Sequence, residues 1–267
     1  MNWFDTAIDW SLSPLRLATR TAQRLAAFAL IVLATIVVKF TRASSVVHPL
    51  IWHQIRFAGL RLLPLIGILS VMAGFVIIGQ TVALLRQIGA QDILGTVLVV
   101  TLFREVAPLV TALLVLLRVG TSTVVELATM RVTGEVEALE ALSIDPIHFL
   151  VVPRVLGLAV SVFCLTVYFL IGAILSGYFF CFIQQLPLSF SDYLNQISRA
   201  LGWQDFLMLM LKSALFGSSL AVIICYQGLS RPLRLDQVPD AATRAVTHSL
   251  MVCVALDALF LGFYFLV

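Results

Sequence analysis

Charged residues are scarce in this sequence. Asp, Glu, Lys and Arg make up 12% of its 267 residues, whereas hydrophobic residues make up 61% and the mean hydropathy is +1.05. A soluble globular domain is typically about 45–50% apolar and about 25% charged. A single core of this size cannot bury such an excess of apolar side chains. The composition therefore excludes an ordinary soluble domain and predicts a membrane protein.

Several chemical signatures are also missing. The chain has no G-x-x-x-x-G-K-[ST] motif, so it lacks the P-loop with which many ATPases bind nucleotide. It also has no H-E-x-x-H motif and no Cys/His cluster. The four cysteines fall inside apolar runs, which is typical of small buried hydrophobic residues. We therefore expect no catalytic residue, no metal site, no cofactor bound by this chain and no nucleic-acid partner.

Long apolar segments are the main feature that the sequence does contain. A helix needs about 20 apolar residues to cross a bilayer. Five segments reach that length, and they cover residues 62–85, 93–117, 155–183, 206–229 and 245–267. No internal repeat, low-complexity tract or soluble domain accompanies them. We expect an all-α integral membrane protein with about five transmembrane helices, which form one membrane domain over residues 62–267.

Residues 1–61 form a separate N-terminal region. An apolar run at 25–38 is too short to span a bilayer comfortably and is flanked by basic residues. Two acids and two tryptophans precede this run, which argues against a cleaved signal peptide. A second stretch at 47–61 mixes basic and apolar side chains. We expect one or two helices lying in the plane of the lipid headgroups.

The basic residues indicate the orientation. If the N-terminus is inside, the external loops hold only Arg86 and Arg199, and the cytoplasmic segments hold twelve Lys and Arg residues. These twelve are Arg16, Arg20, Arg24, Lys39, Arg42, Arg56, Arg61, Arg131, Arg154, Arg231, Arg234 and Arg244. Cytoplasmic loops of membrane proteins carry such an excess. The N-terminus is therefore expected in the cytoplasm and the C-terminus outside.

Four ionisable residues interrupt the predicted spans. Arg104 and Glu105 are adjacent near the middle of the second span, Lys212 lies in the outer half of the fourth, and Asp257 lies near the middle of the fifth. Each costs at least about 2–3 kcal/mol at the bilayer centre unless it is paired or hydrated. We expect one connected polar network, with Lys212–Asp257 as the first pair and with Arg104 and Glu105 facing a pocket or a second subunit. Such a network fixes helix packing, lines a transport path, or does both.

Residues 133–143 are predicted to form a short amphipathic helix in the cytoplasmic loop after the second span. Thr133 is the expected N-cap, and Asp145 ends the element because the residue before a proline is pushed out of helical geometry. The apolar residues fall on one face, and the acids would repel an anionic leaflet. These residues are Val136, Leu139, Leu142, Glu135, Glu137 and Glu140. The helix is therefore expected to dock on a cytoplasmic protein.

A series of short motifs begins within the second predicted span and continues beyond it. They read Arg104-Glu-Val-Ala-Pro108, Arg118-Val-Gly120, Glu126-Leu-Ala-Thr-Met-Arg131, Asp145-Pro146 and Pro153-Arg154. In this order they resemble the MlaE/YrbE family of ABC permeases, whose pattern is approximately R-E-L-G-P, R-x-G, E-x-x-x-M-R, D-P and P-R. Ala107 replaces the usual glycine of the first motif. A second match around Lys212, 242–249 and Asp257 extends the resemblance to about residues 50–267.

The resemblance implies an assembly and a substrate. Such permeases are homodimers that bind two cytoplasmic ABC ATPase subunits, which hold the ATP and the magnesium ion. They also meet a periplasmic MCE-domain hexamer, and together they move phospholipids between the bacterial inner membrane and the outer envelope. The resemblance places Arg104, Glu105 and the adjacent Val106 beside the lipid pathway, and it makes helix 133–143 the contact with the ATPase.

Two other classes of function stay open. A secondary transporter would use Arg104, Glu105 and Asp257 as a proton relay, although five spans are few and no inverted repeat is visible. A membrane enzyme acting on lipids would need a nucleophile or a metal cluster, and the sequence shows neither. A P-loop ATPase that co-purifies at one copy per chain would distinguish the ABC permease from both.

Overall fold

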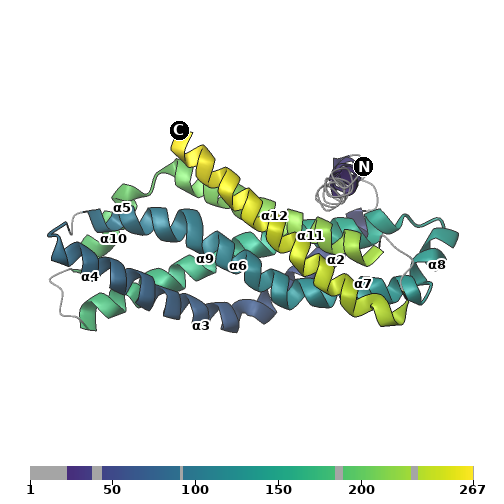
Figure 1. The fold of residues 1–267 in the computed structure, drawn as a ribbon, viewed down its shortest axis with the longest axis horizontal. Coiled ribbons are helices and arrows are strands. Elements are labelled where there is room, and N and C mark those ends of the chain that lie inside the picture. Colours follow the sequence, from purple (N-terminus) through teal and green to yellow (C-terminus); the bar gives the residue numbers. More distant parts are fainter. Residues whose placement is uncertain (1–22, 38–43, 91–92, 184–188, 230–233, 267) are drawn as a thin grey trace, which may run out of the picture.

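Five long helical segments build the molecule. The structure is a computed structural model that describes residues 23–37, 44–90, 93–183, 189–229 and 234–266, with 44–48 and 265–266 described in backbone only. Every regular element in these ranges is helical, which confirms the predicted all-α fold. The segments long and apolar enough to cross a membrane are Pro49–Gln87, Leu94–Val132, Ile147–Ile183, Trp203–Leu229 and Leu235–Tyr264. They lie side by side along the long axis (Figure 1).

Most segments are continuous helices composed of several pieces. The first consists of α2 (Ser44–Ala58), the 3-10 turn η1 (Leu60–Leu62), α3 (Leu63–Ala73), the π-helical η2 (Gly74–Ile78) and α4 (Gly79–Gln87). The second consists of α5 (Leu94–Leu98), the π-helical η4 (Val99–Val106), α6 (Ala107–Val115), the π-helical η5 (Leu116–Gly120) and α7 (Thr121–Val132). The rest are α8 (Glu135–Ala141), η6 (Ile147–Val151), α9 (Val152–Ile183), α10 (Phe190–Ala200), α11 (Trp203–Leu229), η7 (Leu235–Gln237) and α12 (Val238–Leu266).

The helices are longer than the apolar runs that predicted them. The stretch at 47–61 is helical as expected, but it joins the first span through a single 3-10 turn after Gly59. The second helix continues to Val132, well beyond the predicted end at residue 117. The apolar run at 25–38 forms a separate shorter helix, Gln23–Val37. The basic residues Arg16, Arg20, Lys39, Arg42 and Arg231 lie outside the described residues.

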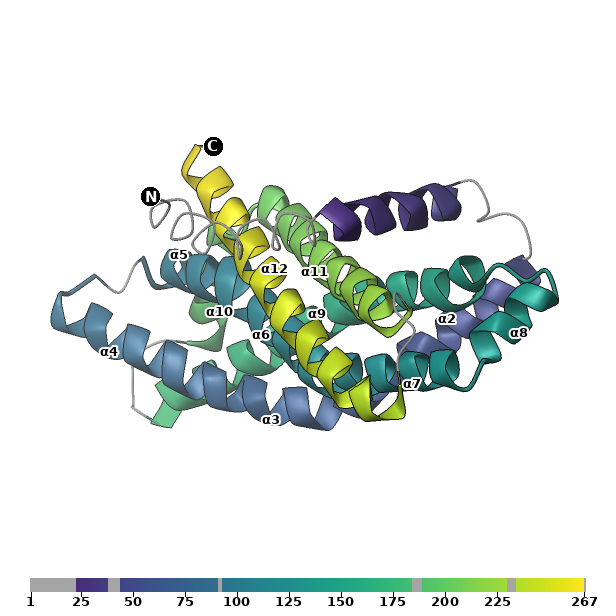
Figure 2. The same cartoon turned by 45° about the vertical axis from the view of Figure 1, so that its right-hand side comes forward.

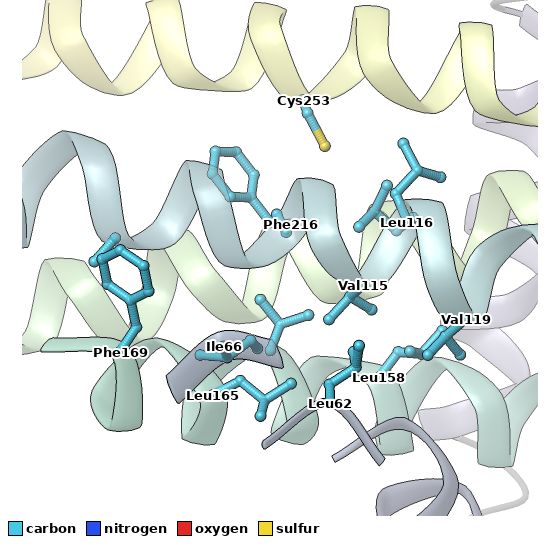
Figure 3. Close-up of a cluster of buried hydrophobic side chains, with 14 of the residues drawn as sticks. Leu62, Ile66, Val115, Leu116, Val119, Leu158, Leu165, Phe169, Phe216 and Cys253 are labelled. Carbon is cyan, nitrogen blue, oxygen red and sulfur yellow. The ribbon is translucent and has the colours of Figure 1, made fainter. Parts of the chain in front are cut away.

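The helices share one apolar core, and each long segment contributes to it. The side chains labelled in Figure 3 are all 2% exposed or less. They are Leu62 and Ile66 from the first segment, Val115, Leu116 and Val119 from the second, Leu158, Leu165 and Phe169 from α9, Phe216 from α11 and Cys253 from α12. Close approach of small residues holds such bundles together, because lipid tails are as apolar as the core. At Gly217, a Cβ atom would lie 2.6 Å from the Leu158 carbonyl oxygen, so α11 and α9 touch through their backbones.

Short helices mark the two ends of the bundle. Figures 1 and 2 place α8 at one end, and α5 and α10 at the other. The sequence analysis missed α10, a short helix within the loop predicted to be external. Tyr193 anchors α10, because its side chain is fully buried and its hydroxyl donates a hydrogen bond to the Ile174 carbonyl oxygen at 3.2 Å. Burial raises the pKa of Tyr193, so the hydroxyl keeps the proton that it donates.

Candidate functional site

Arg104 and Glu105 lie in an irregular part of the second segment. They belong to the π-helical turn η4, which ends at Val106. Pro108 follows in α6, and proline has no backbone N–H to donate to the carbonyl group four residues earlier. That carbonyl belongs to Arg104, so it lacks its usual α-helical donor. The side chain of Lys212 fills this role, with its Nζ atom 2.7 Å from the Arg104 carbonyl oxygen.

Lys212 is the centre of the site. Its side chain is 1% exposed, and its ammonium group has three acceptors within reach. Besides the Arg104 carbonyl, it donates to Glu105 Oε2 at 3.1 Å and forms an ion pair with Asp257 Oδ1 at 2.8 Å. The contact with Asp257 is electrostatic and lacks the direction of a hydrogen bond. An ammonium group has three N–H donors, and here three oxygen atoms surround it, two of them from carboxylates. The site therefore supplies the opposite charge and the acceptors that a buried charge requires.

Arg104 points its guanidinium group toward a different acid. Its Nε and Nη2 atoms lie 2.9 and 2.7 Å from Asp205 Oδ1, and the group lies 4.7 Å from the centre of the Tyr264 ring. The other carboxylate oxygen of Asp205 accepts the backbone N–H of Gly202 at 3.0 Å, which caps the start of α11. Residue 104 therefore connects the two ion pairs of Lys212, through its carbonyl group, with the Arg104–Asp205 ion pair of its own side chain.

The structure settles most of the predicted geometry. The Lys212–Asp257 pair is confirmed, and the four predicted charges belong to one connected network. Arg104 and Glu105, which were expected to face a pocket or a second subunit, also have partners within the chain, because Asp205 binds one and Lys212 binds the other. Asp205 escaped the sequence analysis because it lies one residue before the predicted start of the fourth span.

The network is not sealed inside the chain. The side chains of Arg104, Glu105 and Asp257 are 31, 26 and 21% exposed, although Lys212 is buried. Val106 is half-buried against the apolar core and contributes no polar group. With both acids ionised, the Lys212 cluster carries one more negative charge than positive, and Glu105 Oε1 is buried without a hydrogen-bond partner. The site therefore presents polar groups at a surface of helices that are otherwise apolar.

The predicted docking helix exists as α8, but its start differs from the expectation. Thr133 is not its N-cap: its hydroxyl donates to the Thr129 carbonyl oxygen at 3.0 Å, and the residue ends α7. Gly134 precedes α8 with a positive φ of 78°, which glycine adopts without strain. α8 ends at Ala141, and Asp145 instead accepts the backbone N–H of Ile147 at 3.0 Å.

The faces of α8 also differ from the expectation. Val136 is 2% exposed and Leu139 is half-buried, so most of the apolar face packs on the chain itself. Glu135 accepts a hydrogen bond from Thr133 at 3.2 Å, and Glu137 forms an ion pair with Arg131 at 3.3 Å. Glu140 is exposed, as are Leu142 at 72% and Ile144 at 38%. The exposed tip after α8 is therefore apolar, with Glu140 beside it.

Comparison with known proteins now identifies the chain. A family model described as "Permease MlaE" matches residues 51–263. The chain belongs to this family. The match begins inside α2 and ends near the C-terminus of α12, so it includes the whole Lys212 network and α8. Among the residues that the structure describes, no group of three or more His, Cys, Asp or Glu side chains is arranged to hold a metal ion.

Several curated proteins are similar to this MlaE-family chain. A probable ABC transporter permease protein of Rickettsia felis is 31% identical over 94% of this chain and 98% of its own length. A probable ABC transporter permease protein of Synechocystis is 33% identical over 75% of this chain and 74% of its own length. The chloroplastic protein trigalactosyldiacylglycerol 1 of Arabidopsis thaliana is 28% identical over 75% of this chain and 58% of its own length. The family and these names identify a multi-pass permease subunit of the ABC transporter type.

Proposed function

We propose that this permease moves phospholipids between the bacterial inner membrane and a periplasmic MCE-domain hexamer, driven by separate ATPase subunits. The observation that carries the proposal is the Lys212 network, which places charged groups in the middle of apolar helices of an ABC permease. A phospholipid combines a charged headgroup with apolar tails, so a polar site among apolar walls suits it. A diacylglycerol lipid in the name of the Arabidopsis relative also favours a glycerolipid substrate.

The working unit in this proposal is a homodimer. Arg104, Glu105 and Asp257 are partly exposed, and charged groups that face lipid directly are costly. In the last long segment, Leu235–Tyr264, only 17% of the most apolar 18-residue stretch is buried within the chain, against 33–50% in the other four long segments. A second copy related by two-fold symmetry would cover this surface and enclose the polar groups between the two chains.

Energy comes from outside the chain. Two ABC ATPase subunits bind ATP and magnesium in the cytoplasm, and this chain binds no cofactor of its own. The docking surface is the exposed tip of Glu140, Leu142 and Ile144, since Val136 is occupied by packing within the chain. In this arrangement the N-terminus is cytoplasmic, the C-terminus is periplasmic, and α10 faces the MCE partner.

Composition of the native complex tests this function against the alternatives. The tagged chain is extracted from its own membrane in mild detergent, and the complex is weighed by native mass spectrometry. We expect two copies of the chain, two copies of a P-loop ATPase and retained phospholipids. An ATPase-competent species with one copy of the chain would overturn the homodimer. Transport by the chain without any ATPase would instead identify a secondary transporter.

A further inference from the structure

A second polar site lies far from the Lys212 network. A cavity of about 270 Å³ opens at the α8 end of the bundle, between α2, α7 and the segment that contains η6 and the start of α9. Its lining includes Gln54, Glu126, Met130 and Arg154. Glu126 is 21 positions beyond Glu105 on the same helical segment, which corresponds to about 32 Å. Glu126, Met130 and Arg154 belong to the motifs of the sequence analysis, and the Lys212 network uses none of them.

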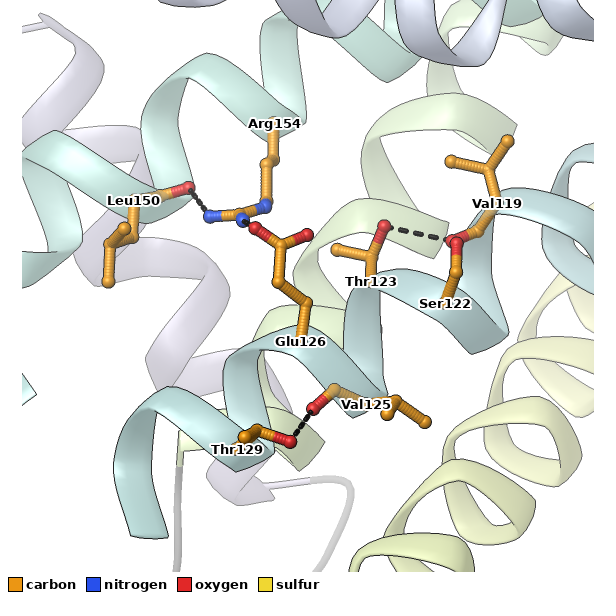
Figure 4. Close-up of polar contacts among 8 residues, drawn as sticks. All are labelled: Val119, Ser122, Thr123, Val125, Glu126, Thr129, Leu150 and Arg154. Carbon is orange, nitrogen blue, oxygen red and sulfur yellow. Dashed lines mark hydrogen bonds and ion pairs between the residues drawn. The ribbon is translucent and has the colours of Figure 1, made fainter. Parts of the chain in front are cut away.

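Two residues that line this cavity each have a buried hydrogen-bond donor with no partner among the described residues. The side chain of Gln54 is 8% exposed, and its Nε2 atom is buried without an acceptor. Arg154 donates from Nη1 to the Leu150 carbonyl oxygen at 3.0 Å and from Nη2 to Glu126 Oε1 at 2.8 Å (Figure 4). Its Nε atom is buried and unpaired. Buried donors without acceptors are rare in native proteins, so these two groups point to a ligand that brings acceptor oxygens.

The same cavity also contains a carboxylate. The Glu126 side chain is 56% exposed, and its ion pair with Arg154 involves only Oε1. A free anion would be repelled by this carboxylate, because like charges at close range disfavour each other. A ligand that carries a cationic group next to its acceptor oxygens matches both sets of partners. Leu50 and Phe57 add apolar surface to the lining.

The depth of the cavity agrees with that of a lipid headgroup. Glu126 is 32 positions from Leu94 at the far end of its segment, or about 48 Å of helix. Arg154 is 29 positions from Ile183, or about 44 Å. A bilayer with its headgroups is about 40–45 Å thick. Trp52, which is 59% exposed, precedes the cavity residue His53, and tryptophan is enriched at the membrane–water interface.

We propose that this cavity binds the headgroup of a zwitterionic aminophospholipid from the leaflet at the α8 end. The phosphate oxygens accept hydrogen bonds from Gln54 Nε2 and Arg154 Nε, and the ammonium group binds the Glu126 carboxylate. The acyl chains leave the cavity past Leu50 and Phe57. This site is additional to the transport pathway, and its occupation requires neither ATP nor a partner subunit. Its test is therefore independent of the transport test.

Protection of a cysteine at the cavity rim gives a local readout. The test protein is the full chain with His53→Cys and Cys164→Ala, because Cys164 is exposed and the other three cysteines are buried. Labelling by a water-soluble maleimide is timed with dihexanoyl phosphatidylethanolamine, dihexanoyl phosphatidylglycerol or inorganic phosphate. We expect the ethanolamine lipid to slow labelling at a concentration about tenfold below that of the glycerol lipid, and phosphate not to slow it.

Two substitutions separate the contacts. Gln54→Glu keeps the shape but replaces the donor, and it should raise the protecting concentration of the ethanolamine lipid about tenfold or more. Glu126→Gln should remove the preference for ethanolamine over glycerol. Asp240→Asn, an exposed acid elsewhere on the α8 side, is the matched control and should change neither value. A separate Leu142→Cys reporter, in the Cys164→Ala background, should label at the same rate with and without lipid in every variant, which shows that the lipid does not slow the maleimide reaction itself. Thermal unfolding in detergent shows that each variant is folded.

Several results would overturn the proposal. Equal protection by phosphate would identify a free anion site, and equal protection by both lipids in the unsubstituted cavity would remove the role of Glu126. No protection by any probe, or unchanged protection in Gln54→Glu, would mean that water alone satisfies the buried donors.

Discussion

At the scale of single residues, the burial of Lys212 depends on partners from two other helical segments. The ammonium group contacts the Arg104 carbonyl and Glu105 on the second segment and Asp257 on α12, while Lys212 itself belongs to α11. Pro108 is part of this arrangement, since it leaves the Arg104 carbonyl without its α-helical donor. Two acids share one lysine, so the three side chains are not equivalent. Removing the lysine strands two charges, whereas removing one acid leaves a matched pair.

We therefore predict unequal effects within the network. Lys212→Met should destabilise the fold by about 3–5 kcal/mol, because breaking a buried pair leaves an uncompensated charge. Asp257→Asn should be milder, because Lys212 and Glu105 still pair. Thermal unfolding of the purified chain in detergent measures both. Arg86→Met, at an exposed site on α4 outside the network, serves as the control. If Lys212→Met and Asp257→Asn lowered the stability equally, Glu105 and Asp257 would not share the charge of Lys212.

At the scale of elements, backbone contact between helices sets the packing. α9 and α11 touch at Gly217, where any side chain would meet the Leu158 carbonyl oxygen and the Ala159 Cα atom, at 2.6 and 2.7 Å from its Cβ. Backbone atoms cannot move aside as a flexible side chain can. Gly262 on α12 is the opposite case, because a Cβ atom there meets nothing within 4 Å.

The two glycines should respond with opposite signs. Gly217→Ala should lower the free energy of unfolding by about 1–3 kcal/mol, which is the usual cost of overpacking. Gly262→Ala should be neutral or raise it by up to about 1 kcal/mol, because alanine favours the helix. Thermal unfolding and size-exclusion profiles measure both. A destabilised Gly262→Ala would indicate that a second copy packs closely on α12 at this point.

The tip after α8 should determine binding of the ATPase. Leu142→Ala with Glu140→Lys should reduce ATPase association about tenfold or more, because it removes the exposed apolar contact and reverses the neighbouring charge. Glu137 is a poorer choice, since reversing it also breaks its ion pair with Arg131. Asp192→Lys on α10, at the other end of the bundle, is the matched charge reversal. Pull-down of the ATPase at constant salt measures the change, and undiminished binding would assign α8 another task.

Sequence reasoning succeeded where a single physical cost dominated. Charges in an apolar span must find partners, so the pairing of Lys212 with Asp257 followed from depth and sign alone. It failed where local alternatives compete. Thr133 can cap the following helix or bond back to the preceding turn, and the residue types do not decide between them. Asp205 lay outside a boundary drawn by hydropathy, and the π-helical turn around Arg104 leaves no periodic signal that apolar spacing reveals.

At the scale of the whole molecule, one chain is an incomplete transporter. The charged network lies partly exposed at a surface of the five-helix bundle. The most apolar stretch of the last segment is also mostly unburied within the chain. The bundle also extends well beyond the about 30 Å of hydrocarbon that it must cross. Its overhang at the α8 end includes the docking tip and the proposed headgroup cavity. In the proposed account, the chain has distinct regions for a second copy, for an ATPase and for lipid.

Transfer of phospholipid in a purified system tests the central claim most directly. The chain is reconstituted in liposomes with its ATPase and its MCE partner, and movement of a labelled phospholipid between membrane and MCE protein is followed. We predict transfer that requires hydrolysable ATP and that falls about tenfold or more in Asp257→Asn while that variant still binds the ATPase. Equal transfer without ATP, or ATP hydrolysis stimulated by the partner with no movement of lipid, would contradict the account.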